Sequence, residues 1–312
     1  MEIINGGSEA LGPSKHTGVG LGNFDGLHIG HMALVNTLIR ESTLNCLDSL
    51  IYTFTKHPEN IIRKKLFTPL LTTVDKKVEL LGETALKYLY FDEFDESYSR
   101  MKPESFVRDI LVERLKAKLI VAGFNYRFGY RGLGDASMLK DMGKSCGFKV
   151  IIIPPIKIDN EIVSSTLIRQ YVSKGDMDRV FKLLGRHYSI TAKVVSGRRI
   201  GSTLGFPTAN IHPEDYLILP SYGVYVTRTL VDGTLYSSVT NIGMNPTFEG
   251  IKKVSVETHI LDFEGVLYGK RIEVFFIARI RGERKFKDKD GLVAQIREDV
   301  GKAREFFDLN GD

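Results

Sequence analysis

The sequence predicts an α/β protein of two domains: a doubly wound parallel sheet over residues 1–183, then an antiparallel β-barrel with a terminal helix over residues 184–312. Two observations predict this fold class. Apolar runs alternate with helical patterns up to about residue 183, as in parallel strands joined by right-handed helical crossovers. From about residue 187 the runs become short, β-rich and separated by turn residues, as in an antiparallel barrel.

The first domain contains five apolar runs that we expect to be buried strands, at residues 18–21, 49–54, 88–91, 118–122 and 149–153. A helix follows the first strand, because apolar residues recur at helical spacing from Met32 onward. Further helical patterns lie near residues 74–86, 103–116 and 135–145, and Pro103 suits the first turn of the second. In an open sheet of this kind, ligands bind beyond the carboxyl ends of the strands.

Two short helices, at residues 166–173 and 177–184, link the domains, and Gly185 follows the second. The barrel strands are expected at residues 187–195, 223–230, 235–239, 254–261 and 271–277. A final amphipathic helix, at about residues 290–307, is expected to pack across the barrel.

Composition limits the classes of protein that the chain can belong to. Of its 312 residues, 43% are apolar and 26% are charged, which is typical of a globular protein. No run of about 18 apolar residues and no secretory signal pattern is present, so we expect no membrane span and a cytoplasmic location.

Cys46 and Cys146 are the two cysteines and form no metal-type cluster, in keeping with a reducing compartment. The net charge of +5 is dispersed and accompanies no RNA-recognition or helix-turn-helix motif, so we expect phosphorylated small substrates rather than nucleic acid.

Residues 22–31 form a candidate phosphate site on the turn between the first strand and its helix. Gly22 and Gly26 allow a tight turn and close approach to a ligand, and the helix N-terminus beyond them favours an anion. His28 and His31 are three residues apart, so both rings can face one ligand from the first helical turn. The expected phosphate-binding residues here are Gly22, Phe24, Asp25, Gly26 and Gly30, with His28 and His31 as catalytic residues.

Two segments of the first domain carry side chains suited to a planar or phosphorylated ligand. His57 follows the second predicted strand. Asn125, Tyr126 and Arg127 follow the fourth, and they offer an amide with donor and acceptor, a ring that can pack on a planar group, and a guanidinium. We expect Asn125, Tyr126 and Arg127 at the ligand, and His57 is expected there through the resemblance given below. A plain strand end is the alternative interpretation of His57.

Residues 163–169 open the first linking helix with polar side chains. Ser164, Ser165 and Thr166 offer hydroxyls and helical N–H groups that suit phosphate oxygens. Arg169 lies one turn later and can reach the same anion with two donors. An ordinary helix cap is the alternative interpretation of the serines, and the histidine turn in the same domain favours the phosphate site.

Residues 197–211 form a second candidate nucleotide site in the other domain. Gly197, Gly201 and Gly205 give a loop whose backbone N–H groups can surround phosphates, although the Gly-Lys-Ser/Thr of a Walker A motif is missing. Thr208 and Asn210 alternate in an extended stretch and so point to the same side, where two neutral oxygens suit Mg²⁺.

These segments resemble two enzyme families. The motif at residues 22–31 resembles the His-x-Gly-His signature of nucleotidyltransferases, especially their flavin branch, and residues 53–58, 121–135 and 163–169 resemble further parts of that branch. Residues 197–211, 241–248, 256–263 and 279–286 resemble riboflavin kinases. Together the resemblances cover nearly the whole chain, in the order found in the prokaryotic bifunctional riboflavin kinase/FMN adenylyltransferase (FAD synthetase) family.

The resemblance to kinases implies that the barrel phosphorylates riboflavin to FMN. Glu257 matches the family's general base, and a carboxylate there can take the proton from a ribityl hydroxyl as it attacks ATP. A solvent-facing strand residue is the alternative interpretation of Glu257. Thr208 and Asn210 are implied as metal ligands for Mg²⁺, and Arg281 and Glu283 as flavin contacts.

The resemblance to nucleotidyltransferases implies that the first domain transfers AMP from ATP to FMN, giving FAD and pyrophosphate. His28, His31 and Arg169 then neutralise charge on the leaving group. His57, Asn125, Tyr126 and Arg127 are the implied flavin contacts. Riboflavin, FMN and ATP are the expected small-molecule partners.

Two other functions stay open at this point. One is a monofunctional riboflavin kinase with a non-catalytic N-terminal domain. The other is a flavin-sensing or RNA-binding regulator built on the same folds, because a fold does not fix a function. The oligomeric state does not follow from the sequence.

Overall fold

The computed structural model describes residues 1–6, 13–56, 60, 68–196, 204–246 and 252–309. The chain divides by its contacts into two units, Met1–Ser165 and Thr166–Asp312. This division assigns nearly all of the linking helices α7 (Ser165–Lys174) and α8 (Met177–Leu184) to the second unit, and a boundary after residue 183 remains a prediction. Within the described ranges, no helix is long and apolar enough to cross a bilayer.

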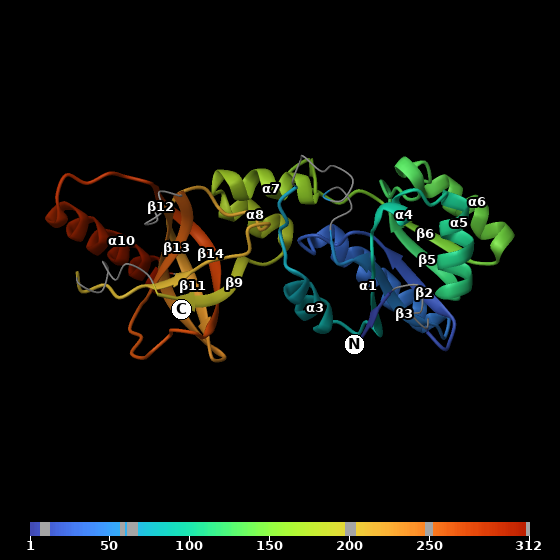
Figure 1. Ribbon diagram of the computed structural model, residues 1–312, viewed down its shortest axis with the longest axis horizontal. Coiled ribbons are helices and arrows are strands. Elements are labelled where there is room, and N and C mark those ends of the chain that lie inside the picture. Colours follow the sequence, from blue (N-terminus) through green and yellow to red (C-terminus); the bar gives the residue numbers. More distant parts are fainter. Residues whose placement is uncertain (7–12, 57–59, 61–67, 197–203, 247–251, 310–312) are drawn as a thin grey trace. The chain divides into compact units, whose positions relative to one another are not determined.

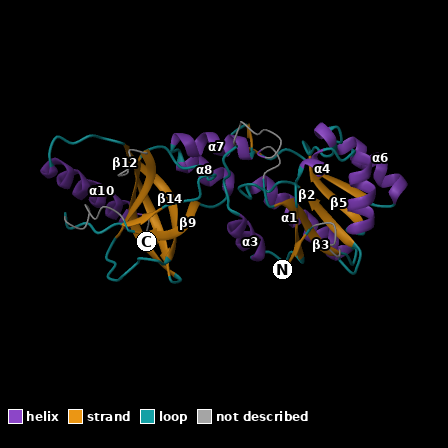
Figure 2. Cartoon of the chain, viewed as in Figure 1, coloured by secondary structure: helices purple, strands orange, loops and turns teal. Residues whose placement is uncertain are grey.

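The first unit is built on a six-stranded sheet in which all neighbouring strands are parallel (Figures 1 and 2). Its strands are β1 (Glu2–Asn5), β2 (Thr17–Leu21), β3 (Asp48–Phe54), β4 (Tyr88–Asp92), β5 (Ala117–Gly123) and β6 (Lys149–Ile153), in the spatial order β1-β4-β3-β2-β5-β6. The five predicted strands are confirmed. The edge strand β1 was not predicted, because its four residues carry only a two-residue apolar run.

Helices cover both faces of this sheet, which confirms the doubly wound prediction. On one face, α1 (Ile29–Leu44) and α3 (Val74–Gly82) pack on a core that contains Ile51 and Leu89. On the other face, the π-helix η1 (Phe106–Arg114) and α6 (Ala136–Cys146) pack on a core that contains Tyr52 and Tyr90. The shorter elements of this unit are α4 (Glu96–Ser99), α5 (Pro103–Ser105), η2 (Tyr130–Gly132) and the hairpin of β7 (Lys157–Ile158) and β8 (Glu161–Ile162).

The strand order places a ligand crevice between β2 and β5. The chain proceeds from β2 outward through β3 to β4, and then returns to the opposite side of β2 with β5. Ligands of open α/β sheets bind at such a reversal, beyond the carboxyl ends of the two strands. The loops after Leu21 and after Gly123 both begin at this edge.

The second unit is a closed barrel of six strands in the order β10-β13-β12-β11-β14-β9, with every neighbouring pair antiparallel. The strands are β9 (Tyr188–Val195), β10 (Ala209–Ile211), β11 (Gly223–Val231), β12 (Thr234–Pro246), β13 (Lys252–Ile260) and β14 (Arg271–Gly282). The terminal helix α10 (Lys289–Leu309) packs Ala303 and Phe307 against Val224 and Val226 of the barrel. The predicted barrel and final helix are therefore confirmed.

Candidate active sites

The loop that follows β2 brings His28 and His31 together at the start of α1. His28 is the N-cap of this helix, and its Nδ1 accepts a hydrogen bond from the backbone N–H of His31 at 3.2 Å. The two rings are stacked, with centroids 3.6 Å apart and an interplanar angle of 13°. Because Nδ1 accepts, a neutral His28 ring carries its proton on Nε2, which is then a donor for an anion. The helix N-terminus favours negative charge at the same place.

Asp25 organises this loop through its buried carboxylate. Asp25 Oδ1 accepts hydrogen bonds from the backbone N–H groups of Leu71 at 2.9 Å and Thr72 at 3.2 Å. The Thr72 hydroxyl in turn accepts from the N–H of Gly26 at 3.1 Å. Phe24 is 0% exposed and belongs to the core under α1. Asp25 and Phe24 therefore support the loop from below, and their direct contact with phosphate stays a prediction.

The serine pair of residues 164–165 meets the same loop. Ser165 Oγ donates a hydrogen bond to the backbone carbonyl of Asp25 at 2.8 Å, so two segments 140 residues apart in the chain are joined. Ser164 precedes it in the first unit. Thr166 and Arg169 lie on α7 in the second unit, and their place at the phosphate site stays a prediction.

The loop after β5 carries the second predicted set of side chains. Asn125 and Arg127 are exposed there, while Tyr126 is half-buried and stacks on Phe128 with centroids 5.9 Å apart. Burial raises the pKa of Tyr126 above its ordinary value, so its hydroxyl stays protonated and able to donate. Because β5 lies beside β2, this loop starts at the sheet edge that also carries the His28 loop.

A row of three polar side chains crosses the barrel wall in the second unit. Glu257 of β13 is directly opposite Asn210 of β10 on one side and Asn241 of β12 on the other. Cross-strand partners share a face of the sheet, so the three side chains lie side by side. The residues before and after Glu257, Val256 and Thr258, are 0% exposed. The row therefore points away from the barrel interior.

This row lines a cavity of about 310 Å³, which lies within the range of small-molecule sites. Thr208 lines the cavity beside Asn210, and Glu283 lines it from the end of β14. The apolar part of its wall comes from Leu204, Phe206, Val224, Val239, Phe286, Leu292, Ile296 and Val300. A cavity with one polar row and a large apolar wall suits a ligand with a flat ring and a hydroxylated tail.

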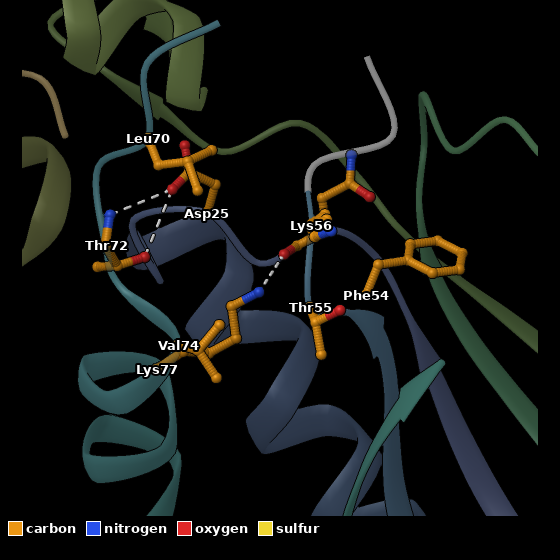
Figure 3. Close-up of a pocket in the computed structure, with 9 residues that line it drawn as sticks. Asp25, Phe54, Thr55, Lys56, Leu70, Thr72, Val74 and Lys77 are labelled. Atoms are coloured by element: carbon orange, nitrogen blue, oxygen red, sulfur yellow. Dashed lines mark hydrogen bonds between the residues drawn. The ribbon is translucent and has the colours of Figure 1, made fainter. Parts of the chain in front are cut away.

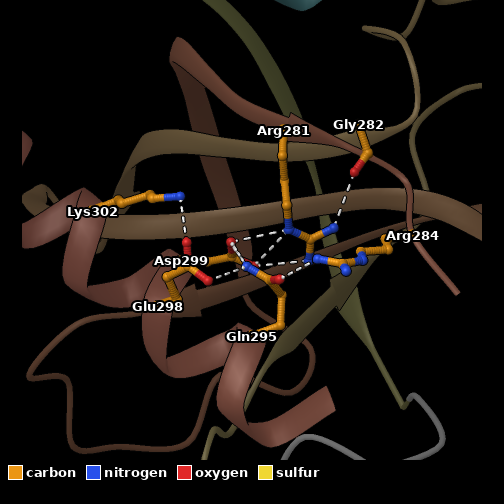
Figure 4. Close-up of polar contacts among 7 residues, drawn as sticks. All are labelled: Arg281, Gly282, Arg284, Gln295, Glu298, Asp299 and Lys302. Carbon is orange, nitrogen blue, oxygen red and sulfur yellow. Dashed lines mark hydrogen bonds and ion pairs between the residues drawn. The ribbon is translucent and has the colours of Figure 1, made fainter. Parts of the chain in front are cut away.

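Arg281 is held in the wall of this cavity by α10 (Figure 4). Its Nε donates to both carboxylate oxygens of Asp299, at 3.0 and 3.1 Å, and its Nη2 donates to Oδ2 at 2.8 Å. Gln295 donates to the same carboxylate at 3.2 Å and accepts from Arg284 at 3.2 Å. This network, Arg281–Asp299–Gln295–Arg284, joins the end of β14 to α10. This network does not test the predicted contact between Arg281 and a flavin, which stays a prediction.

Replacing Asp299 by asparagine is expected to weaken the second unit and its ligand cavity. The change leaves the Arg281 guanidinium without its buried counter-charge, and the lost charge-assisted bonds cost about 2–3 kcal/mol of unfolding free energy. Denaturant unfolding measures this loss, and ligands of the cavity are expected to bind more weakly. Glu305→Gln is the matched control, because Glu305 is exposed on the same helix and lies outside this network. Equal effects of both substitutions would contradict the role of the network.

Two residues of these sites were missed in the sequence. Asn241 lies in a segment that resembles kinases, but its pairing with Glu257 depends on strand register, which no local pattern shows. Lys77 is buried under the His28 loop. The feature of the sequence that could have indicated it is a charged residue that interrupts the apolar stripe of its helix between Val74 and Leu81.

Three predicted site residues, His57, Gly197 and Gly201, lie outside the described residues. Gly205 is described and has a φ of +86°, which glycine adopts readily.

Comparisons with known proteins match both halves of the chain. A family model described as FAD synthetase matches residues 13–167, and one described as riboflavin kinase matches residues 184–307. A crystal structure named as a macrolide-efflux protein from Streptococcus pneumoniae is similar, with a TM-score of 0.89 and 29% sequence identity over 97% of this chain and 99% of that one.

Curated relatives align along the whole length. The bifunctional riboflavin kinase/FMN adenylyltransferase of Buchnera aphidicola subsp. Schizaphis graminum is 33% identical, with 99% of this chain and 100% of that protein covered. The protein of the same name from Escherichia coli strain K12 is also 33% identical, with 99% of each chain covered. The chain therefore belongs to the bifunctional riboflavin kinase/FMN adenylyltransferase family.

Proposed function

We propose that the chain makes FAD from riboflavin in two steps, at two separate sites. Residues 184–312 carry the riboflavin kinase, which converts riboflavin and ATP to FMN and ADP. Residues 1–183 carry the FMN adenylyltransferase, which converts FMN and a second ATP to FAD and pyrophosphate. One observation supports this best. Each family model matches one half of the chain, and each half contains its own cluster of polar side chains, the histidine pair in the first and the Glu257 row in the second.

In the kinase, Glu257 acts as the general base. It takes the proton of the terminal ribityl hydroxyl while that oxygen attacks the γ-phosphorus of ATP, and the bond from this phosphorus to the β–γ bridging oxygen breaks to release ADP. Asn210 and Asn241 flank the carboxylate and can orient it and the hydroxyl. The apolar wall of the cavity accepts the isoalloxazine ring.

In the adenylyltransferase, an FMN phosphate oxygen attacks the α-phosphorus of ATP in line, and the bond to the α–β bridging oxygen breaks to release pyrophosphate. No side-chain nucleophile is needed, because the protein only has to position two anions and neutralise charge on the leaving group. His28, His31 and the N-terminus of α1 serve this purpose. Arg169 and the hydroxyls of residues 164–166 complete the phosphate site in this proposal, and the loop after β5 holds the flavin.

Mg²⁺ is proposed as the metal of both reactions. Thr208 and Asn210 offer hard, neutral oxygens at one cavity wall, which suits this ion. Among the described residues no group of three or more His, Cys, Asp or Glu side chains is placed for a metal. Phosphates of ATP would supply further ligands. When bound, Mg²⁺ offsets negative charge on the transferring phosphates.

We also propose a cytoplasmic location without nucleic-acid partners, in keeping with the unpaired Cys46 and Cys146.

The direct test is chromatography of the products that the purified protein makes from riboflavin, ATP and Mg²⁺, with a parallel reaction that starts from FMN. The expected result is FMN followed by FAD in the first reaction, and FAD in the second. If the first reaction stopped at FMN and added FMN stayed unchanged, the chain would be a monofunctional kinase. Salt-sensitive RNA binding without turnover would instead indicate a regulator.

A further inference from the structure

Lys77 is a buried cation beneath the loop that carries His28. Only 7% of Lys77 is exposed, and it comes from the first turns of α3. Figure 3 shows its amine directed up from the helix, within a small pocket that Asp25, Thr55, Lys56 and Thr72 also line. None of the motifs described above contains it. A charged amine is costly to bury, so its presence needs a reason other than packing.

The amine of Lys77 is fixed on one backbone carbonyl. Its Nζ donates to the carbonyl oxygen of Asn23 at 2.8 Å and lies 3.4 Å from the hydroxyl of Thr53. That hydroxyl donates to the same carbonyl oxygen at 3.2 Å. Asn23 is the second residue of the loop that begins after β2, five positions before His28. Helix α3 and strand β3 thus hold the loop at the point where it leaves the sheet.

This carbonyl has to be held, because the next residue has an unfavourable backbone conformation. Phe24 has a φ of +50°, in the left-handed region that residues with side chains rarely adopt. Rotating the peptide between Asn23 and Phe24 by half a turn would bring φ to about −130°, which is favourable for phenylalanine. Leu27, directly before His28, also has a positive φ of +40°. The native loop is therefore a strained conformation, which persists only where surrounding contacts determine it.

We propose that Lys77 is a positioning residue for adenylyl transfer: through the Asn23 carbonyl it fixes the loop that presents His28 at the N-terminus of α1. The inference rests on the adenylyltransferase site proposed above. Lys77 acts on the loop and not on the phosphates. Its loss lets the Asn23–Phe24 peptide rotate, and His28 then leaves the position in which it meets the ligand.

A lysine that served stability alone would behave differently. Burial lowers the pKa of Lys77 from 10.5 to about 8, against the opposing attraction of Asp25. Between pH 8 and pH 10.5 the unfolded chain binds more protons than the folded chain, so the free energy of unfolding rises with pH. Below about pH 8 the lysine is charged in both states, and the buried ammonium lowers the free energy of unfolding. Lys77→Met removes that cost. The variant is expected to unfold at the same temperature as the wild type or higher at pH 7, while it loses activity.

The test compares Lys77→Met with Lys87→Met, a matched control on an exposed lysine of the same unit. At pH 7, Lys77→Met is expected to lower kcat of FAD formation from FMN about 30- to 100-fold, the size of effect that a small misplacement of reacting groups produces. Riboflavin phosphorylation by the same preparation is expected to stay within about twofold of the wild type, as are both activities of Lys87→Met.

Thr53→Val supplies a second and milder variant. It removes the weaker donor to the same carbonyl and keeps the side-chain shape, so a loss of about three- to tenfold in FAD formation is expected. If the wild type forms FAD and both variants match it, the positioning role is wrong. A lowered unfolding temperature of Lys77→Met with unchanged kcat would also overturn it. Failure of the wild type itself to form FAD from FMN would refute the proposed function instead, and the inference with it.

Discussion

Glu257→Gln is expected to lower kcat for riboflavin phosphorylation about 10²- to 10⁴-fold, the usual contribution of a general base. Glutamine keeps the size and polarity of the side chain, but it cannot accept the hydroxyl proton at neutral pH. The row of Asn210, Glu257 and Asn241 therefore stays in place and only the proton transfer is lost. The rate of FMN formation under saturating riboflavin and ATP measures the effect.

FAD formation from added FMN is the internal control for this substitution. It takes place in the other half of the chain and is expected to be unchanged in Glu257→Gln. Glu264→Gln, a change of the same type at an exposed position after β13, is expected to leave both activities intact. A Glu257→Gln enzyme that phosphorylates riboflavin at the wild-type rate would show that another group accepts the proton.

His28→Ala is expected to lower the rate of FAD formation from FMN about 10²- to 10³-fold. The substitution removes the imidazole N–H, and the loss of one preorganised hydrogen-bond donor to charge that develops in the transition state has an effect of this size. FMN formation from riboflavin is expected to be unaffected. The substitution also removes the N-cap of α1, which costs about 1 kcal/mol of stability, so the activity has to be separated from the cap.

His28→Asn makes this separation. Asparagine is a good N-cap and can accept from the N–H of His31, but it does not carry the imidazole to the ligand. It is expected to unfold like the wild type and to lose FAD formation nearly as fully as His28→Ala. His16→Ala, at an exposed histidine of the same unit, serves as the control. An asparagine variant with wild-type FAD formation would reduce the role of His28 to capping.

The sequence predicted the architecture well, because apolar periodicity is a local property. The parallel sheet, the barrel and the terminal helix follow from runs of a few residues each. Two features of the barrel depend on distant partners and were missed: β12 continues to Pro246, and the short strand β10 closes the barrel between β13 and β9. Strand β1 was missed for a related reason, since its pairing with β4 defines it.

The motifs predicted where both candidate sites lie, but they did not predict which contacts each residue makes there. Asp25 lies in the phosphate motif, yet its carboxylate binds backbone N–H groups 46 and 47 residues away. Asn241 becomes a neighbour of Glu257 only through strand register. Lys77 lies on a predicted helix, and only the fold reveals that its amine meets the Asn23 carbonyl 54 residues away. Supporting residues of this kind act through tertiary contacts that a local pattern does not contain.

The central claim is that two independent sites on one chain carry the two reactions, and mixing two variants tests it most directly. His28→Ala alone is expected to convert riboflavin to FMN and stop, and Glu257→Gln alone is expected to leave riboflavin almost unchanged. An equimolar mixture of the two, given riboflavin, ATP and Mg²⁺, is expected to accumulate FAD, because free FMN from one variant is the substrate of the other. A mixture that forms no FAD, because folded His28→Ala makes no FMN or folded Glu257→Gln converts none, would contradict the claim.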